Sequence, residues 1–284
     1  MQVFVFPGQG SQVKGMGGDL FDSVIEYTSV EPQVDEILGY SMRDLCLNDP
    51  NDLLGQTQFT QPALYVVNAL NYYNAMKEGG KPEYVAGHSL GEYNALLAAG
   101  AFDFLTGLKL VQKRGELMAQ ARDGGMAAII GIDADAIQQV LVDNNFDGID
   151  IANFNSPSQT VISGPVDQLN QAESAFKDAG VKLYKVLPVS AAFHSRYMKS
   201  AGDEFASFLK EFTFNELHTP AVANVTAEPY PANNESVAKE LLVKQISGSV
   251  QWTQSVRYLK SLGDAEFSEV GPGKVLARLI KQID

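Results

Sequence analysis

The sequence predicts an α/β fold in which a small subdomain is inserted into a large one. Short apolar strands alternate with amphipathic helices along most of the 284 residues. From Met126 onward the predicted order is strand, helix, strand, strand, helix, strand, which is the split β-α-β order of ferredoxin-like subdomains. The composition changes just before this order begins, at Asp123-Gly124-Gly125. We therefore expect a large subdomain of residues 1–123 and 189–284 and a small ferredoxin-like subdomain of residues 124–188.

The first part of the chain predicts one strand and then a helix-rich segment. Gln2–Phe6 is expected to be a short buried strand, because it is apolar and is stopped by Pro7 and the glycines that follow. A helix is expected to open at Gln61 with Pro62 in its first turn, where the missing N–H of proline has no partner to lose.

A second strand and two helices are predicted next. The strand is Tyr84–Ala86, and Glu92–Ala99 is small and apolar enough to be a buried helix. The next helix begins near the N-cap Asp103 and ends near Arg122. At 100° per residue Arg114 falls near the centre of the apolar side of this helix. An unpaired guanidinium there would be costly, so Arg114 needs an anionic partner, either a protein carboxylate or a bound anion.

The remaining elements follow from the same periodicities. Those of the small subdomain are strand Met126–Gly131, helix Ala134–Asn144, strands Ile149–Phe154 and Thr160–Ser163, helix Val166–Ala179 and strand Lys182–Leu187. Those of the rest of the large subdomain are helices Arg196–Glu211, Ser236–Ile246, Thr253–Ser261 and one after Gly273, and strands Ala221–Val225 and Phe267–Val270.

Composition excludes several classes of function. With 21 Lys and Arg against 34 Asp and Glu the net charge is −13, which disfavours a nucleic-acid partner. The single cysteine, Cys46, excludes an internal disulfide and a cysteine-based metal cage, and its apolar neighbours predict a buried thiol. No run approaches the ~20 apolar residues of a membrane span, and the first residues lack a signal peptide's basic start. We expect a cytoplasmic monomer without a bound metal.

Ser89 is the strongest candidate for a catalytic residue. It lies in the run Gly87-His-Ser-Leu-Gly91 between a predicted strand and a predicted helix, which is the nucleophile-elbow arrangement of α/β-hydrolase-like folds. The turn places Ser89 at a helix N-terminus, where the N–H of Leu90 can bind an oxyanion. The alternative is an ordinary glycine-bounded loop that contains a serine by chance.

A serine hydroxyl needs a base to remove its proton, and the sequence has three histidines. His88 is adjacent to Ser89 and cannot readily reach back across the turn, and His218 is expected in a solvated loop. His194, among small and aromatic residues, is therefore the predicted base. Its second ring nitrogen needs an acceptor, which is either a carboxylate or a backbone carbonyl. No acidic residue between Ser89 and His194 stands out for this role.

A second glycine loop, with Gln9 between Gly8 and Gly10, follows the first strand. Bare backbone here could supply another oxyanion N–H, although a plain turn explains an isolated Gly-x-Gly equally well. The loop lacks the spacing of a phosphate-binding or dinucleotide-binding motif.

Six segments, in one order along nearly the whole chain, resemble the malonyl-CoA:acyl carrier protein transacylases. They are Phe6–Gln12, Gly87–Glu92, Asn153–Pro157, Val161–Gly164, Ala192–Ser195 and Val270–Lys274. Leu38–Ser41 and Thr57–Leu70 look closest to the discrete, trans-acting acyltransferases of polyketide synthases. The chain departs from the family at Gly248-Ser249, where Asn-Pro is usual.

The resemblance implies a ping-pong transfer of a malonyl group from malonyl-CoA, through an acyl-serine, to the phosphopantetheine thiol of an acyl carrier protein. It implies no permanently bound cofactor. The residue roles that it implies are nucleophile for Ser89, base for His194, oxyanion hole for Gln9 and Leu90, carboxylate binding for Arg114, selection against larger acyl groups for Phe193, and orientation of His194 by the carbonyl of Gln245. Simple core packing explains Phe193 equally well on physical grounds.

Three alternatives remain at this point. The chain could serve fatty-acid synthesis instead of polyketide synthesis, or it could hydrolyse acyl groups from carrier proteins. Hydrolysis of neutral acyl chains has no use for a buried Arg114. A catalytically silent scaffold is the third alternative, and it would not need Ser89, His194, Arg114 and Gln9 together.

Overall fold

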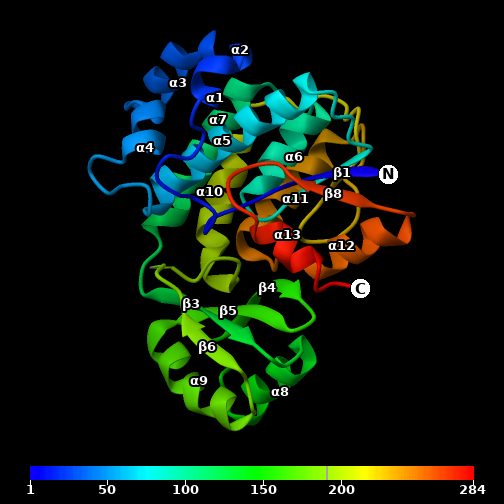
Figure 1. The fold of residues 1–284 in the computed structure, drawn as a ribbon. Coiled ribbons are helices and arrows are strands. Elements are labelled where there is room, and N and C mark those ends of the chain that lie inside the picture. Colours follow the sequence, from blue (N-terminus) through cyan, green and yellow to red (C-terminus); the bar gives the residue numbers. More distant parts are fainter. Residues whose placement is uncertain (190) are drawn as a thin grey trace.

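The structure is a computed structural model that describes residues 1–189 and 191–284, so Ser190 lies outside the described residues. The described chain contains two four-stranded sheets, one parallel and one antiparallel. Figure 1 shows the antiparallel sheet with its two helices as a separate lobe below the parallel sheet and its helices. Both termini lie in the upper lobe. The predicted α/β class with a large and a small part is confirmed.

The parallel sheet has the strand order β7-β2-β1-β8. Its strands are β1 (Gln2–Phe6), β2 (Tyr84–Gly87), β7 (Ala221–Val222) and β8 (Glu266–Glu269). Side chains of β1 alternate between two separate cores, because successive residues of a strand point to opposite faces. Phe4 and Phe6 pack in one core, and Val3 and Val5 pack in the other. Both faces of this sheet are therefore covered, as expected of a parallel sheet.

Helices from both ends of the chain cover the parallel sheet. The helices before the small lobe are α1 (Leu20–Ser23), α2 (Ile25–Thr28), α3 (Glu31–Leu38), α4 (Met42–Asn48), α5 (Thr57–Lys77), α6 (Gly91–Ala99) and α7 (Phe104–Gln120). Those after it are the 3₁₀ turn η1 (Arg196–Met198), α10 (Lys199–Leu209), α11 (Glu235–Ser247), α12 (Trp252–Ser261) and α13 (Val275–Ile280).

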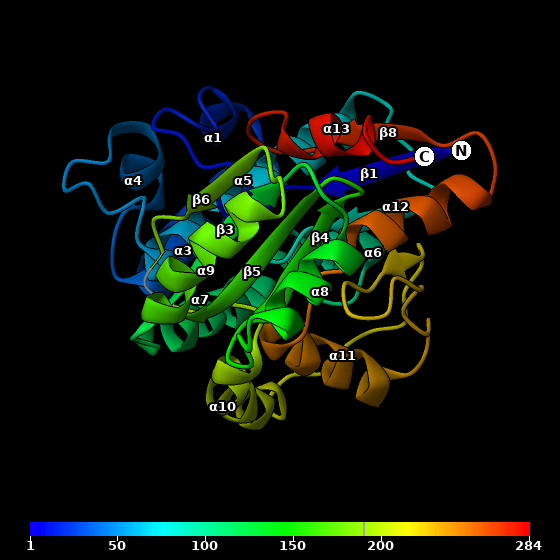
Figure 2. The same ribbon diagram turned by 90° about the horizontal axis from the view of Figure 1, so that it is seen from below.

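The antiparallel sheet has the order β4-β5-β3-β6. Its elements are β3 (Gly124–Ile130), α8 (Ala134–Asp143), β4 (Asp150–Ser156), β5 (Gln159–Pro165), α9 (Val166–Asp178) and β6 (Leu183–Val186). Figure 2 shows α8 and α9 side by side on one face of this sheet. Ala127 and Ile129 are buried under these helices, whereas Met126 and Ala128 line a cavity on the opposite face. Because side chains alternate along a strand, one face of this sheet packs against α8 and α9, and the other faces the cavity.

The structure corrects two helix predictions. Helix α5 begins at Thr57 and not at Gln61, so Pro62 lies inside the helix and the predicted first-turn position is wrong. The earlier turn is held by Thr60, whose hydroxyl donates to the carbonyls of Leu54 (2.7 Å) and Gln56 (3.0 Å). The helix expected over Arg196–Glu211 is instead η1 followed by α10, because Ser195 caps the 3₁₀ turn by accepting from the N–H of Tyr197.

Two further expectations concern burial. Cys46 is completely buried, and burial raises the pKa of its thiol. Among the described residues, none of the helices has the length and apolar character that crossing a bilayer requires.

Candidate active site

Ser89 lies in the tight turn between β2 and α6. Its φ of +50° is in the left-handed region, which is unfavourable for a residue other than glycine and is held only where the surroundings enforce it. A Cβ on Gly87 would lie 1.9 Å from the carbonyl carbon of Gly91, and a Cβ on Gly91 would lie 2.0 Å from the carbonyl oxygen of Phe6. Both glycines are thus required by close backbone contacts, as the elbow motif predicts.

The contact at Gly91 makes a testable prediction about stability. Gly91→Ala should lower the free energy of unfolding by at least about 2–3 kcal/mol, because Phe6 belongs to the central strand and cannot move away. Thermal unfolding measures the loss. Gly115→Ala is the matched control, since its Cβ would meet its nearest neighbour at 3.4 Å. Equal loss of stability in the two variants would contradict the close contact at Gly91.

His194 contacts Ser89, as predicted. Its Nε2 lies 2.8 Å from the Ser89 Oγ, and its Nδ1 lies 2.8 Å from the carbonyl oxygen of Gln245. The carbonyl accepts the Nδ1 proton, so Nε2 is the nitrogen that can accept a proton from Ser89. Reasoning from the residues left the orienting group open between a carboxylate and a carbonyl. The family resemblance implied the carbonyl of Gln245, which lies at this nitrogen in the described residues.

His194 is 4% exposed and has a depressed pKa. Burial, followed by the positive charge of Arg114, lowers its pKa to about 3. The imidazole is therefore neutral at ordinary pH and can act as a base. Its φ of +56° is also left-handed, so both members of the Ser89–His194 pair occupy unfavourable backbone conformations.

Arg114 is 1% exposed on α7, at the buried position that the helical periodicity predicts. Its guanidinium donates to the side-chain oxygens of Gln61 (2.7 Å) and Gln245 (2.9 Å) and to the Ser89 Oγ (3.1 Å). The ring of Tyr93 lies 5.6 Å from its central carbon. Burial lowers the pKa of Arg114.

Of the two partners that the sequence left open for Arg114, the protein carboxylate is not found among the described residues. In the part of the chain that the structure describes, no carboxylate lies within ion-pair distance of Arg114, and its Nε has no hydrogen-bond partner. Neutral amide oxygens hold the cation instead. A buried guanidinium with neutral partners and an unused N–H is suited to an incoming anion.

The predicted oxyanion residues, Gln9 and Leu90, lie beside Ser89. Leu90 is the N-cap of α6, and both residues line the same cavity as Ser89. The Gln9 loop touches the nucleophile turn, because a Cβ on Gly8 would lie 2.4 Å from the carbonyl oxygen of His88. Within residues 1–189 and 191–284, neither the Gln9 N–H nor the Leu90 N–H donates a hydrogen bond. Both are free to bind an oxyanion.

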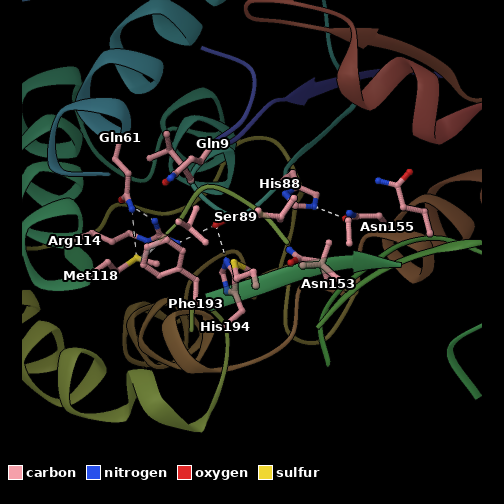
Figure 3. A pocket seen from close by; sticks show the side chains of 17 residues that line it. Gln9, Gln61, His88, Ser89, Arg114, Met118, Asn153, Asn155, Phe193 and His194 are labelled. Atoms are coloured by element: carbon pink, nitrogen blue, oxygen red, sulfur yellow. Dashed lines mark hydrogen bonds between the residues drawn. The ribbon is translucent and has the colours of Figure 1, made fainter. Parts of the chain in front are cut away.

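These side chains converge on one cavity of about 230 Å³ between the two lobes (Figure 3). Its apolar wall contains Phe193, and both lobes contribute amide side chains to its lining. The apolar lining residues include Leu90, Met118, Met126, Val161, Leu187, Val189 and Phe193. The amide-bearing lining residues are Gln9, Gln61, Asn153, Asn155 and Gln159. Figure 3 shows Arg114 to the left of Ser89, His194 below it, and His88 on the side away from Arg114.

His88 turns away from the Ser89–His194 pair, as expected for a residue that cannot reach back across the turn. Its Nε2 lies 2.8 Å from the Asn155 Oδ1 of the small lobe, and its ring packs edge-on against Trp252 at 5.6 Å. His218, the third histidine, is exposed and contacts Thr219.

Several polar residues of the site escaped sequence reasoning. Gln61 and the side chain of Gln245 hold Arg114, and Asn224 accepts a hydrogen bond from the N–H of Ser89 (2.7 Å). Glu92, the last residue of the Gly87–Glu92 motif, is completely buried and accepts from Asn224, Tyr230 and Gln245. The sequence signal that could have identified Glu92 is a glutamate among the small apolar residues of a predicted buried helix.

The sequence profile of the acyl transferase domain family matches residues 3–283. The chain is 52% identical to the polyketide biosynthesis malonyl CoA-acyl carrier protein transacylase BaeC of Bacillus velezensis, over all of this chain and 96% of that protein. It is 41% identical to the malonyl CoA-acyl carrier protein transacylase of Escherichia coli K12, over 99% of this chain and 92% of that one. In the longer polyketide biosynthesis protein PksE of Bacillus subtilis, it matches 36% of the length at 49% identity.

Solved structures agree with these relatives. A crystal structure of a malonyl CoA-acyl carrier protein transacylase from Burkholderia pseudomallei superposes with a TM-score of 0.94 at 49% identity, covering all of this chain and 97% of that one. A malonyl-transacylase in complex with a type II polyketide synthase acyl-carrier protein gives a TM-score of 0.93 at 36% identity, covering 99% of this chain and 92% of that one.

Proposed function

This chain belongs to the acyl transferase domain family, and from that premise we propose that it transfers a malonyl group from malonyl-CoA to the phosphopantetheine thiol of an acyl carrier protein. One observation carries the proposal. A buried guanidinium, Arg114, lies in hydrogen-bond contact with the nucleophile Ser89 and has no carboxylate partner among the described residues. The carboxylate of a carboxylated acyl group can pair with Arg114 while the thioester of the same group reaches Ser89.

In the first half of the reaction the malonyl group moves to Ser89. His194 Nε2 takes the Oγ proton as Oγ attacks the thioester carbonyl, and the N–H groups of Gln9 and Leu90 bind the oxyanion. The tetrahedral intermediate then breaks its C–S bond. The CoA sulfur leaves as a thiol with the proton from His194, so the base returns to its neutral form.

In the second half the same groups act in reverse. The carrier's thiol gives its proton to His194 while its sulfur attacks the acyl-serine, and collapse of the intermediate returns the proton to Ser89 Oγ. The carbonyl of Gln245 keeps the imidazole oriented in both halves. A hydrolase would differ only in that water takes the place of the thiol.

Arg114 selects the acyl group. The malonyl carboxylate accepts from the guanidinium, whose Nε has no partner among the described residues, and forms a charge-assisted pair that an acetyl group cannot form. The carboxylate also neutralises the positive charge beside His194, which is the second cause of the lowered His194 pKa.

Phe193 sets the size of the acyl group, and this gives a second prediction. The side chain lies in the cavity wall next to His194 and is 6% exposed. Phe193→Ser should raise the ratio of methylmalonyl to malonyl transfer by about tenfold, because the space beside C2 then admits a methyl group. Competition between the two CoA esters measures this ratio. Val189→Ser, at another apolar position of the same cavity, is the control that should leave the ratio unchanged.

The pathway proposed is trans-acting supply of malonyl groups to a polyketide synthase, with fatty-acid synthesis as the second candidate. The 52% identity to BaeC against 41% to the Escherichia coli enzyme favours the first. We further propose a cytoplasmic monomer that needs no permanently bound cofactor, nucleic acid or membrane. The small lobe, residues 124–188, acts as a subdomain that closes the cavity with Asn153, Asn155 and Val161.

Intact-mass measurement after incubation with malonyl-CoA tests the function. The enzyme should gain one malonyl group, and an added phosphopantetheinylated carrier protein should then take it up. Loss of the group to water as fast as to the carrier would favour the hydrolase instead. An unmodified enzyme with an unmodified carrier would exclude the proposed reaction.

A further inference from the structure

Glu92 is a completely buried carboxylate in the first turn of α6, directly after the nucleophile turn. Its two oxygens accept hydrogen bonds from three segments that are distant in the sequence. Oε1 accepts from the backbone N–H of Asn224 (3.1 Å) and from the hydroxyl of Tyr230. Oε2 accepts from the side-chain amide of Gln245 on α11. The proposed reaction has so far assigned no role to this group.

Asn224 and Gln245, which both donate to Glu92, also contact the reacting residues. Asn224 accepts from the N–H of Ser89 (2.7 Å) through its side-chain oxygen and donates to the carbonyl of Gly87 (2.6 Å). The Gln245 Nε2 also donates to the carbonyl of Ser89 (2.7 Å). Asn224 and Gln245 therefore both hold the strained nucleophile turn.

Gln245 connects Glu92 to two further groups. Its side-chain oxygen accepts from Arg114 (2.9 Å), and its backbone carbonyl accepts from His194 (2.8 Å). A carboxylate can only accept hydrogen bonds. Glu92 therefore fixes the orientation of this amide, with the NH₂ group toward the carboxylate and the oxygen toward Arg114.

A glutamine at position 92 could not replace the carboxylate. An amide has one acceptor oxygen and one NH₂ group. The NH₂ group would face either the N–H of Asn224 or the NH₂ of Gln245, both of which are donors. One of the two connections would be broken, and a buried donor left unpaired is costly.

We propose that Glu92 is a positioning residue for acyl transfer, whose ionised carboxylate holds Ser89 through Asn224 and holds Arg114 and His194 through Gln245. The inference rests on the function proposed above, because its consequence is the rate at which Ser89 is acylated.

The ionisation of Glu92 links this role to pH. Burial raises the pKa of Glu92 to about 7, although hydrogen bonds from Tyr230, Asn224 and Gln245 and the charge of Arg114 oppose the rise. Its charged and titratable neighbours are Arg114 on α7, Tyr93 on α6 and Tyr230 in the segment after β7. As the pH falls through about 7, Glu92 gains a proton and one oxygen becomes a donor. The pKa of His194 is lowered by burial and by Arg114, and the Glu92→Gln variant distinguishes an acid limb of Glu92 from one of His194.

Rapid-quench mass measurement of Ser89 acylation by malonyl-CoA, from about pH 5 to about pH 9, tests the inference. The wild type should lose rate below about pH 7. Glu92→Gln should acylate Ser89 about 100-fold more slowly at high pH and should lack this acid limb, because displaced reacting groups cost about that factor. Tyr230→Phe is the matched control. It should keep the high-pH rate within about threefold and shift the limb to higher pH, since the lost hydrogen bond lowered the pKa of Glu92.

The outcomes separate the inference from the function. An acid limb near pH 7 that persists in Glu92→Gln, or a high-pH rate within about threefold of the wild type, would overturn the positioning role alone. If Glu92→Gln does not fold, the wild type and Tyr230→Phe decide, and a wild-type rate that is flat down to about pH 5 overturns the inference. A wild type that gains no malonyl group at any pH overturns the proposed function, and with it this role.

Discussion

Replacing His194 by alanine is expected to lower the rate of Ser89 acylation by about 10⁴-fold, the upper end of the range for a general base. His194 Nε2 lies 2.8 Å from the Ser89 Oγ, and no other histidine of the described chain contacts that oxygen. Without the base, the hydroxyl must lose its proton to water, and the leaving thiol also loses its proton donor. Single-turnover acylation by malonyl-CoA, followed by mass measurement, gives the rate.

The control for this prediction is His218→Ala. His218 is exposed. In residues 1–189 and 191–284, Thr219 is the only hydrogen-bond partner of its ring. This variant should acylate at the wild-type rate. A loss below about tenfold in His194→Ala would show that another group removes the proton and would exclude the dyad.

Replacing Arg114 by alanine is expected to lower malonyl transfer by on the order of 100-fold, because truncating one partner of a buried charge pair costs about 2–5 kcal/mol. Acetyl transfer should fall much less, since an acetyl group has no carboxylate to pair with the guanidinium. Acylation of Ser89 by malonyl-CoA and by acetyl-CoA, measured separately, gives the two ratios. Lys109→Ala, at an exposed position of the same helix, is the control that should change neither rate.

Comparing malonyl-CoA with acetyl-CoA separates the loss of carboxylate binding from a general disturbance of the site. Arg114 also donates to Gln61, Gln245 and Ser89, so its removal disturbs the site as well as the substrate. Such a disturbance acts on both donors alike. Equal losses for malonyl and acetyl transfer would therefore exclude the carboxylate-binding role.

Much of the site could be predicted from the sequence, because its main signals are local. Ser89 is identified by two glycines that the turn needs, and the contacts at 1.9 and 2.0 Å give the physical reason. Arg114 is identified by a charge on the apolar side of a helix, which depends only on the helical period. The period of two likewise places β3 between the helices of the small lobe and the cavity.

The side-chain partners of these residues could not be predicted, because they depend on how distant segments meet. The family resemblance implied only the backbone carbonyl of Gln245, as a partner of His194. Asn224 lies 135 residues from Ser89, and Gln245 lies 131 residues from Arg114. Neither has a local pattern that distinguishes it from other polar residues near a helix or strand end. The start of α5 was missed for a related reason, since Thr60 extends the helix through a contact with Leu54 that proline-based reasoning does not consider.

We propose that Ser89 carries the malonyl group between two thiols, and locating the group in the chain tests this role. The enzyme is pulsed with malonyl-CoA, and half of it is digested and sequenced by mass spectrometry while the other half first meets the carrier protein. A malonyl group is expected on Ser89 and should move to the carrier's phosphopantetheine thiol, whereas Ser89→Ala should show neither adduct nor transfer. A malonyl group on another residue, or undiminished transfer by Ser89→Ala, would contradict it.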